Sequence, residues 1–298
     1  MKKIYSINKL ASLMLIALGL FSCTEEITVK LDNEETRLSV EAKVNSDLKK
    51  HLVILKETSD VFYNQEAVPV KNANVLVSDG VSNFTYIEVN DGVYESEIEF
   101  AGEAGKTYTL SINNVDVNKD GDMEEYLASS TMQQAYAVDS IKLHFDSDHE
   151  SDRGRNDDED EDGEFWLLSI YMQDNPDKED YYAFASRINN LMVHDTITEV
   201  LVQKDTYFNG EKTKGADVSE FNQNKADEIL HDSDIVTLET YAINKDYYDF
   251  VTQLQEMDEG QNMFSGPPGN IKTNISNGAL GFFSVYSITR TSIIHKAE

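Results

Sequence analysis

Alternating oxygen-bearing side chains form the first candidate site for chemistry. Asp116, Asn118 and Asp120 stand at positions 1, 3 and 5 of an EF-hand-type calcium loop, and Asp122 follows the glycine that allows the sharp turn. Calcium binds about six to eight hard oxygens, and a curled loop brings alternate carboxylates to one point. Position 12, where a bidentate Glu belongs, is Leu127. Two interpretations therefore stay open, a calcium site and a polar hairpin turn.

A longer acidic run lies at residues 146–164. It contains eleven acidic residues, two arginines and no apolar residue. Asp158, Asp160 and Asp162 repeat the alternating pattern, but position 12 is Ser169. Because a segment without apolar side chains has no burial to offset its ordering entropy, we predict a mobile acidic loop here. Its field would attract cations or a basic partner.

The single cysteine, Cys23, is the second candidate site. Basic Lys2, Lys3 and Lys9 precede an apolar run that ends in Leu20-Phe21-Ser22-Cys23. The run is too short for a membrane span, which needs ~20 residues. The pattern resembles a lipobox, in which the thiol takes up a diacylglycerol and becomes the acylated N-terminus. We predict a lipoprotein signal peptide at 1–22 and a lipidated tether at 23–35; the alternative is an ordinary secretory signal beside a chance cysteine.

Glu25 and Glu26 follow the cysteine almost directly. An acidic pair at this place looks like the surface-export signal of Bacteroidetes-type lipoproteins, and the alternative is an anchor that faces the periplasm. We expect an outer-membrane protein that is lipid-anchored and faces the cell exterior.

The charge balance excludes several classes of partner. The chain has 25 basic and 55 acidic residues in 298, a formal net charge of −30. Such a chain repels phosphate backbones and anionic head groups, so we expect no nucleic-acid binding and membrane contact only through the lipid anchor. One cysteine allows no internal disulfide and no cysteine-ligated zinc site.

The elements that must position these residues are mainly strands. Apolar and polar residues alternate at Leu38–Val44, and short strands separated by Gly-containing turns continue from there. We predict an N-terminal Ig-like β-sandwich at 36–135, followed by a larger β-rich domain at 136–298. One packed α-helix is expected at about 244–259, where Asn244 is a suitable N-cap and apolar residues recur at helical spacing.

The C-terminal segment carries the most specific pattern. It contains Pro267-Pro268-Gly269-Asn270 and then Asn274-Ile275-Ser276-Asn277-Gly278. The prolines favour an extended segment ending in a turn, Asn277-Gly278 favours a tight hairpin, and Asn270 and Asn274 are suited to side-chain-to-backbone bridges. We interpret the segment as a structural clasp between the helix and the final strands; the alternative is a ligand-contacting loop.

This segment, together with Leu38-Ser-Val-Glu-Ala42 and the Gly92-Val-Tyr94 and Gly105-Lys-Thr-Tyr108 series, resembles a family of Bacteroidetes lipoproteins known as domain of unknown function 4249. The resemblance covers nearly the whole mature chain, although the acidic run at 146–164 departs from the family pattern. It implies an accessory or substrate-capture partner of a TonB-dependent outer-membrane transporter. It implies no catalytic residues.

We therefore expect a non-catalytic protein that requires no cofactor. The alternative is a calcium-stabilised adhesion or structural module of the cell envelope, which rests on the Asp116–Asp122 loop. A third class, a hydrolase of surface glycans or peptides, has only the expected location in its favour, because carboxylates are too abundant here to nominate an acid and a base.

Overall fold

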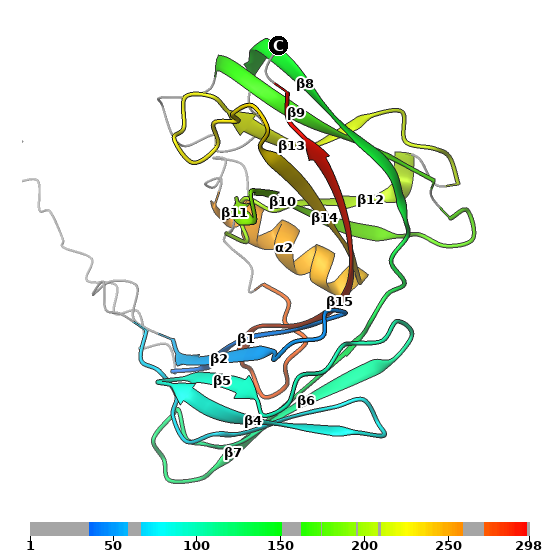
Figure 1. Cartoon of the computed structure of the whole chain (residues 1–298). Coiled ribbons are helices and arrows are strands. Elements are labelled where there is room, and N and C mark those ends of the chain that lie inside the picture. The colour runs from blue at the N-terminus through cyan, green and yellow to red at the C-terminus, as the bar shows by residue number, and fades with distance from the viewer. Residues whose placement is uncertain are drawn as a thin grey trace, which may run out of the picture. The chain divides into compact units, whose positions relative to one another are not determined.

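The alternating pattern forms strands with one buried face. In β1 (Leu38–Asn45), Leu38, Val40, Ala42 and Val44 are buried, whereas Glu41 and Lys43 are exposed. The computed structural model describes residues 36–58, 67–150, 162–173, 175–194, 196–207, 210–258 and 271–296. Within them the chain is mainly β with one α-helix, as the sequence predicts (Figure 1).

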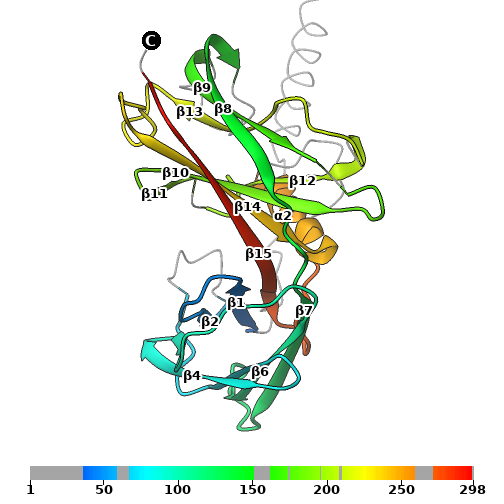
Figure 2. The same ribbon diagram turned by 45° about the vertical axis from the view of Figure 1, so that its right-hand side comes forward.

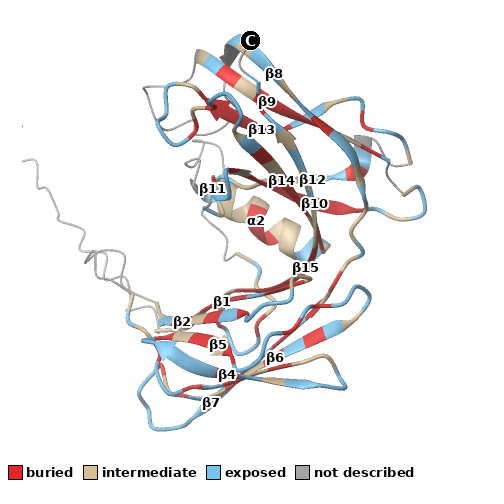
Figure 3. Ribbon diagram, in the orientation of Figure 1, coloured by how far each residue is buried: buried red, intermediate tan, exposed pale blue. Residues whose placement is uncertain are grey.

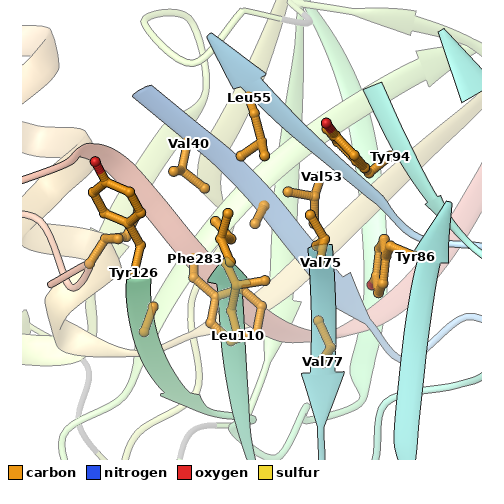
Figure 4. Close-up of a cluster of buried hydrophobic side chains, with 14 of the residues drawn as sticks. Val40, Val53, Leu55, Val75, Val77, Tyr86, Tyr94, Leu110, Tyr126 and Phe283 are labelled. Atoms are coloured by element: carbon orange, nitrogen blue, oxygen red, sulfur yellow. The ribbon is translucent and has the colours of Figure 1, made fainter. Parts of the chain in front are cut away.

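The N-terminal strands enclose the first hydrophobic core. They pair in the order β1-β2-β5-β4-β3-β6-β7, and every pair among them is antiparallel. The strands after β1 are β2 (Leu52–Glu57), β3 (Asn74–Ser78), β4 (Asn83–Asn90), β5 (Val93–Ser96), β6 (Thr107–Val115) and β7 (Glu124–Thr131). Figure 4 shows Val40, Leu55, Tyr94 and Leu110 directed into this core.

A long last strand, β15 (Leu280–Ile294), connects the two parts of the main sheet. Its first half pairs in parallel with β1, and its second half pairs antiparallel with β14 (Ile235–Ile243) (Figure 2). β14 then pairs with β10 (Tyr181–Ile188), which also pairs with β11 (Leu191–Val193) and β12 (Leu201–Lys204). Phe283 and Val285 of β15 lie in the same core as the N-terminal strands. The predicted division at residue 135 stays a prediction.

A separate three-stranded sheet supplies the second core. Its order is β13 (Ala216–Asn222), β9 (Asp162–Met172) and β8 (Val138–Glu150). Leu168, Ile170 and Phe221 of this sheet are buried with Tyr182 of β10 and Leu238 of β14. A short 3-10 helix, η2 (Asp205–Tyr207), follows β12.

The prediction of a loop over 146–164 is wrong at both ends. β8 continues to Glu150 and β9 begins at Asp162, with Glu150 paired to Asp162 and His149 to Gly163. The prediction considered only side-chain burial, but backbone hydrogen bonds extend an anchored hairpin whatever its side chains are. Residues 151–161 lie outside the described residues.

The helix α2 (Lys245–Asp258) occupies the segment predicted as helical. Asn244 caps it, since its Oδ1 accepts a hydrogen bond of 2.8 Å from the Tyr247 N–H. Phe250 and Val251 are buried against Phe282 of β15, so α2 covers the face of β15 that points away from the first core (Figure 3).

Candidate functional site

Several predicted site residues lie outside the described residues. These are the lipidation residue Cys23, the export pair Glu25 and Glu26, and Pro267, Pro268 and Asn270 of the C-terminal loop. The structure therefore bears on the two remaining groups, the Asp116–Asp122 loop and the Asn274–Gly278 turn.

The Asp116–Asp122 loop joins the antiparallel strands β6 and β7 and folds onto itself. Asp116 Oδ2 accepts a hydrogen bond from the Gly121 N–H (3.1 Å), and Asp120 Oδ1 accepts one from the Asp122 N–H (2.8 Å). Asn118 uses both ends of its amide within the loop, because Oδ1 accepts from the Asp120 N–H and Nδ2 donates to Asp120 Oδ2. These contacts are those of a hairpin turn, and the calcium site stays a prediction.

The Asn274–Gly278 segment joins β7 to β15. Asn277 and Gly278 have φ values of 57° and 70°, and the Ala279 N–H donates to Ser276 O, as in a type I′ turn. Asn274 bridges to backbone on β15: its Oδ1 accepts from the Phe283 N–H (2.9 Å) and its Nδ2 donates to Phe283 O (2.8 Å). The segment therefore lies beside residues 280–286 of β15, the stretch whose other edge pairs with β1.

Ser276 fixes the same segment to the edge strand β7. The Ser276 N–H donates to Leu127 O and the Leu127 N–H donates to Ser276 Oγ, both at 2.8 Å. Ile275 next to it is buried in the first core. Just before this turn, the Lys272 N–H donates to Gln253 Oε1 of α2 (3.1 Å) and Thr273 Oγ1 donates to Gly281 O of β15 (2.7 Å). The segment thus contacts α2, β7 and β15, and its interpretation as a structural clasp stays a prediction.

Among the described residues, the sequence did not predict one group of charges that meets on the α2 side of β10, β14 and β15. We call it the Glu239 network: Asp47, Arg187, Glu239, Tyr241 and Arg290. Glu239 is only 2% exposed, and its Oε1 accepts from Arg187 Nε (3.0 Å) and Arg290 Nε (2.7 Å). Its Oε2 accepts from the Tyr241 hydroxyl (2.5 Å), and Arg290 also makes a bidentate ion pair with Asp47 (2.7 and 2.6 Å).

Strand register explains why these residues meet. Ala185, Glu239 and Arg290 are directly opposite one another on β10, β14 and β15, and Arg187 lies one row along on the same face. Asp47 comes from the β1–β2 turn, 243 positions before Arg290 in the chain. In the same turn, Ser46 Oγ accepts from the Ile288 N–H at 2.9 Å. The network and Ser46 together hold the β1–β2 turn on β15.

The electrostatics of Glu239 favour a positioning role over proton transfer. Burial alone would raise its pKa, but hydrogen bonds from Tyr241, Arg290 and Arg187 outweigh burial and hold the pKa below its usual range. A general acid or base near neutral pH needs a pKa close to 7. Glu239 is therefore ionised at neutral pH and neutralised by two guanidinium groups, an arrangement that fixes geometry.

Aromatic side chains continue this face towards α2. The Tyr241 and Tyr286 ring centroids are 5.0 Å apart, and Tyr247 of α2 lies 5.4 Å from Phe282. Burial raises the pKa of Tyr247 to about 12, so its phenol is neutral at physiological pH. Lys43 of β1 lies beside these rings and forms a 2.8 Å ion pair with Glu41.

One sequence signal would have identified part of the network. Glu239 interrupts the otherwise apolar and β-branched strand Ile235–Ile243, and a carboxylate in a buried strand requires a charged or hydrogen-bonding partner. Which of the 25 basic residues provides it is decided by register, so Arg187 and Arg290 were not predictable. Asp47 carried no signal, because acidic residues in turns are common.

Nowhere in the described ranges do three or more His, Cys, Asp or Glu side chains gather closely enough to hold a metal ion. Among the helical residues that the structure describes, none form a helix long and apolar enough to cross a membrane.

Comparison with protein families identifies the chain. The family model for DUF4249, a domain of unknown function, matches residues 24–292. The chain belongs to this family. The DUF4249 region begins one residue after Cys23 and ends within β15, so it includes the Asn274–Gly278 turn and the whole Glu239 network. A search of curated protein sequences gave no match.

Proposed function

We propose that this DUF4249 protein is a lipid-anchored, exterior-facing outer-membrane protein that acts without catalysis as an accessory or substrate-capture partner of a TonB-dependent transporter. The observation that carries the proposal is the position of Cys23. The only cysteine in the chain follows an apolar run with a small residue at −1, and the family region starts at the next residue.

The chemistry of the N-terminus supports anchoring. Each buried CH₂ of an acyl chain contributes about 0.8 kcal/mol, so two or more chains give stable attachment where one gives only marginal binding. A chain of net charge −30 is repelled by anionic lipid, and attachment therefore depends on the acyl chains. Glu25 and Glu26 support export to the outer face.

The folded part supports a binding role more than a catalytic one. Among the described residues, the Glu239 network holds a buried carboxylate that is ionised and neutralised by Arg187 and Arg290. Its chemistry is that of a fixed structural group. In this proposal, the partner binds to exposed strand faces and loops around the two cores.

Localisation and partnership are tested in the native organism. Full-length protein is expected in the detergent phase after Triton X-114 partition and to be degraded when intact cells are treated with protease. Cys23→Ala protein is expected in the aqueous phase, and Glu25→Ala/Glu26→Ala protein in the detergent phase but protected from protease. Recovery of the wild-type lipoprotein alone from solubilised outer membranes, with unimpaired nutrient uptake after its deletion, would contradict the partnership.

The calcium-stabilised module remains a second candidate because of one observation in the Asp116 loop. Asp116 Oδ1 is buried without a hydrogen-bond partner, whereas Oδ2 accepts from Gly121. A bound cation would satisfy such an oxygen. Calcium at 100 times its Kd would add about 2.7 kcal/mol of stability. A thermal shift in calcium that is abolished by Asp120→Ala supports the site, and an equal shift in that variant contradicts it.

A further inference from the structure

Half-buried tyrosines gather where α2 meets the main sheet. Tyr241 of β14, Tyr286 of β15 and Tyr247 of α2 belong to one cluster of packed side chains. The ring centroids of Tyr241 and Tyr286 are 5.0 Å apart, and the Tyr247 ring lies 5.4 Å from Phe282 of β15. None of the three tyrosines is fully buried, so part of each side chain reaches solvent. We call Lys43, Tyr241, Tyr247 and Tyr286 the tyrosine face.

Two groups on this face have unused hydrogen-bonding capacity. Among the described residues, the Tyr247 hydroxyl has no hydrogen-bond partner, although burial raises its pKa to about 12. A phenol withdrawn from water in this way normally finds a partner. Lys43 lies beside Tyr247 and Tyr286, and among the described residues its Nζ donates only to Glu41 (2.8 Å), so two of its three N–H donors stay available. The face therefore combines aromatic surface with available donors.

Strand register places Lys43 on the same side of the sheet as the tyrosines. Lys43 and Asn45 of β1 are directly opposite Ser284 and Tyr286 in the parallel pairing with β15, and residues directly opposite one another share a face. β1, β14 and β15 are all interior strands of the main sheet. Their backbone N–H and C=O groups are used within the sheet, so a ligand on this face meets side chains rather than an open strand edge.

The charges on the sheet side of this face balance. The charged residues of β1, β10, β14 and β15, together with one from the β1–β2 turn, are three basic and three acidic, and all six form ion pairs with one another. They are Lys43, Arg187, Arg290, Glu41, Glu239 and Asp47. The chain as a whole has a net charge of −30 and repels anions, whereas a cation is attracted to its acidic segments rather than to this balanced face. The face therefore favours an uncharged ligand.

We propose that the tyrosine face binds a neutral saccharide, with one sugar ring against Tyr241 and Tyr286 and its hydroxyls bonded to Tyr247 and Lys43. The inference rests on the proposed function and names the substrate class that such a capture protein would hold. A pyranose ring has an apolar C–H face and a rim of hydroxyls, which matches aromatic rings beside available donors. An extended peptide fits less well, because it is recognised by pairing with an open strand edge, and the strands here have none.

The site is tested with full-length lipoprotein purified in detergent from the native organism. The protein is titrated by isothermal calorimetry with neutral hexasaccharides of glucose, xylose and mannose, and at least one should bind with a Kd below about 1 mM. Tyr247→Phe removes only the hydroxyl and should raise that Kd about three- to tenfold, the loss of one hydrogen bond. The matched control is Tyr248→Phe, the next residue of α2, whose ring lies 5.1 Å from Tyr181 of β10; its Kd should match wild type.

A second pair of variants tests the ammonium group. Lys43→Met keeps the length of the side chain and should raise the Kd about three- to tenfold, whereas Lys204→Met, at an exposed lysine on β12, should leave it unchanged. Thermal melts of all four variants establish that the fold is retained. Equal Kd values for wild type, Tyr247→Phe and Lys43→Met would place the ligand elsewhere and overturn the inference. So would wild-type protein that binds none of the hexasaccharides, or that binds pentaalanine or hexagalacturonate more tightly.

The same preparations separate the inference from the proposed function. A TonB-dependent transporter that co-purifies with lipoprotein unable to bind neutral saccharide leaves the proposed function standing and refutes the tyrosine face. Saccharide binding that depends on Tyr247, with no transporter recovered, supports the site and refutes the partnership.

Discussion

Replacing Gly281 with alanine should separate β15 from β1. Gly281 has a φ of 89° and is paired with Val40 in the parallel register of the two strands. A Cβ there would lie well inside contact distance of Val40 O and 2.8 Å from the Val40 carbonyl carbon. Gly281 and Val40 lie in strands whose neighbouring side chains are buried, so neither β15 nor β1 can shift alone.

The expected cost has two parts. A positive φ costs an alanine about 1–2 kcal/mol. The contact with Val40 then forces the strands apart, and the loss of about two backbone hydrogen bonds adds roughly 2 kcal/mol. Gly278→Ala is the matched control, because Gly278 also has a positive φ of 70° but a Cβ would meet nothing within 4 Å. We expect a total of about 3–4 kcal/mol for Gly281→Ala and about 1–2 kcal/mol for the control.

The assay is urea unfolding of the chain without its predicted signal peptide, residues 1–22, followed by circular dichroism and by the fluorescence of Trp166, the only tryptophan. Coincident transitions from the two probes justify a two-state free energy. In thermal melts the roughly 2 kcal/mol difference corresponds to a Tm about 4–8 °C lower for Gly281→Ala than for Gly278→Ala. Equal destabilisation of the two variants, within about 0.5 kcal/mol, would refute the close approach of β15 to β1.

Three further changes test other parts of the structure. Glu239→Gln should destabilise by about 2–3 kcal/mol in urea unfolding, because two guanidinium groups lose their buried anionic acceptor, whereas Asp47→Asn at the exposed end of the network should cost less than about 1 kcal/mol. Burial would raise the pKa of Glu228, but hydrogen bonds from His194 and the Asn222 N–H outweigh burial and lower it. Ionised Glu228 therefore stabilises the fold above the ordinary carboxyl pKa, and this stabilisation is lost as the pH falls through the pKa of Glu228 in the folded protein. Wild-type protein should lose more stability between about pH 5 and pH 3 than Glu228→Gln. Asn274→Ala, which removes the bridge to β15, should cost about 1–2 kcal/mol, and Asn277→Gly, which keeps the positive φ of the turn, should change the free energy of unfolding by less than about 0.5 kcal/mol.

Local patterns predicted the element types well and their ends less well. The period-two pattern identified β1, and the Asn244 cap located the start of α2. The alternation of Tyr94, Ser96, Ile98 and Phe100 would by itself favour a strand that reaches Phe100, but β5 ends at Ser96 and Ile98 is 58% exposed. Ser96 Oγ donates to Ile98 O, which turns the chain there, and side-chain periodicity contains no information about such a bond.

The candidate site residues also fall into two groups, those set by local contacts and those set by strand pairing. The type I′ turn at Asn277-Gly278 and the bridge from Asn274 depend on contacts within ten residues, so composition was sufficient to suggest them. The Glu239 network depends on which strands are neighbours. No alternation within β14 specifies that neighbour, and the network was absent from the sequence-based predictions.

The sequence by itself determined the mainly β class, the single described helix, the acidic character and the expectation of a lipid anchor at Cys23, because each follows from local spacing or composition. Only the tertiary structure decided that β15 pairs with β1 and β14, and that Asp47 meets Arg290. The physical reason is strand register. A strand can hydrogen-bond with any other strand, and the choice is made by how all the side chains pack together.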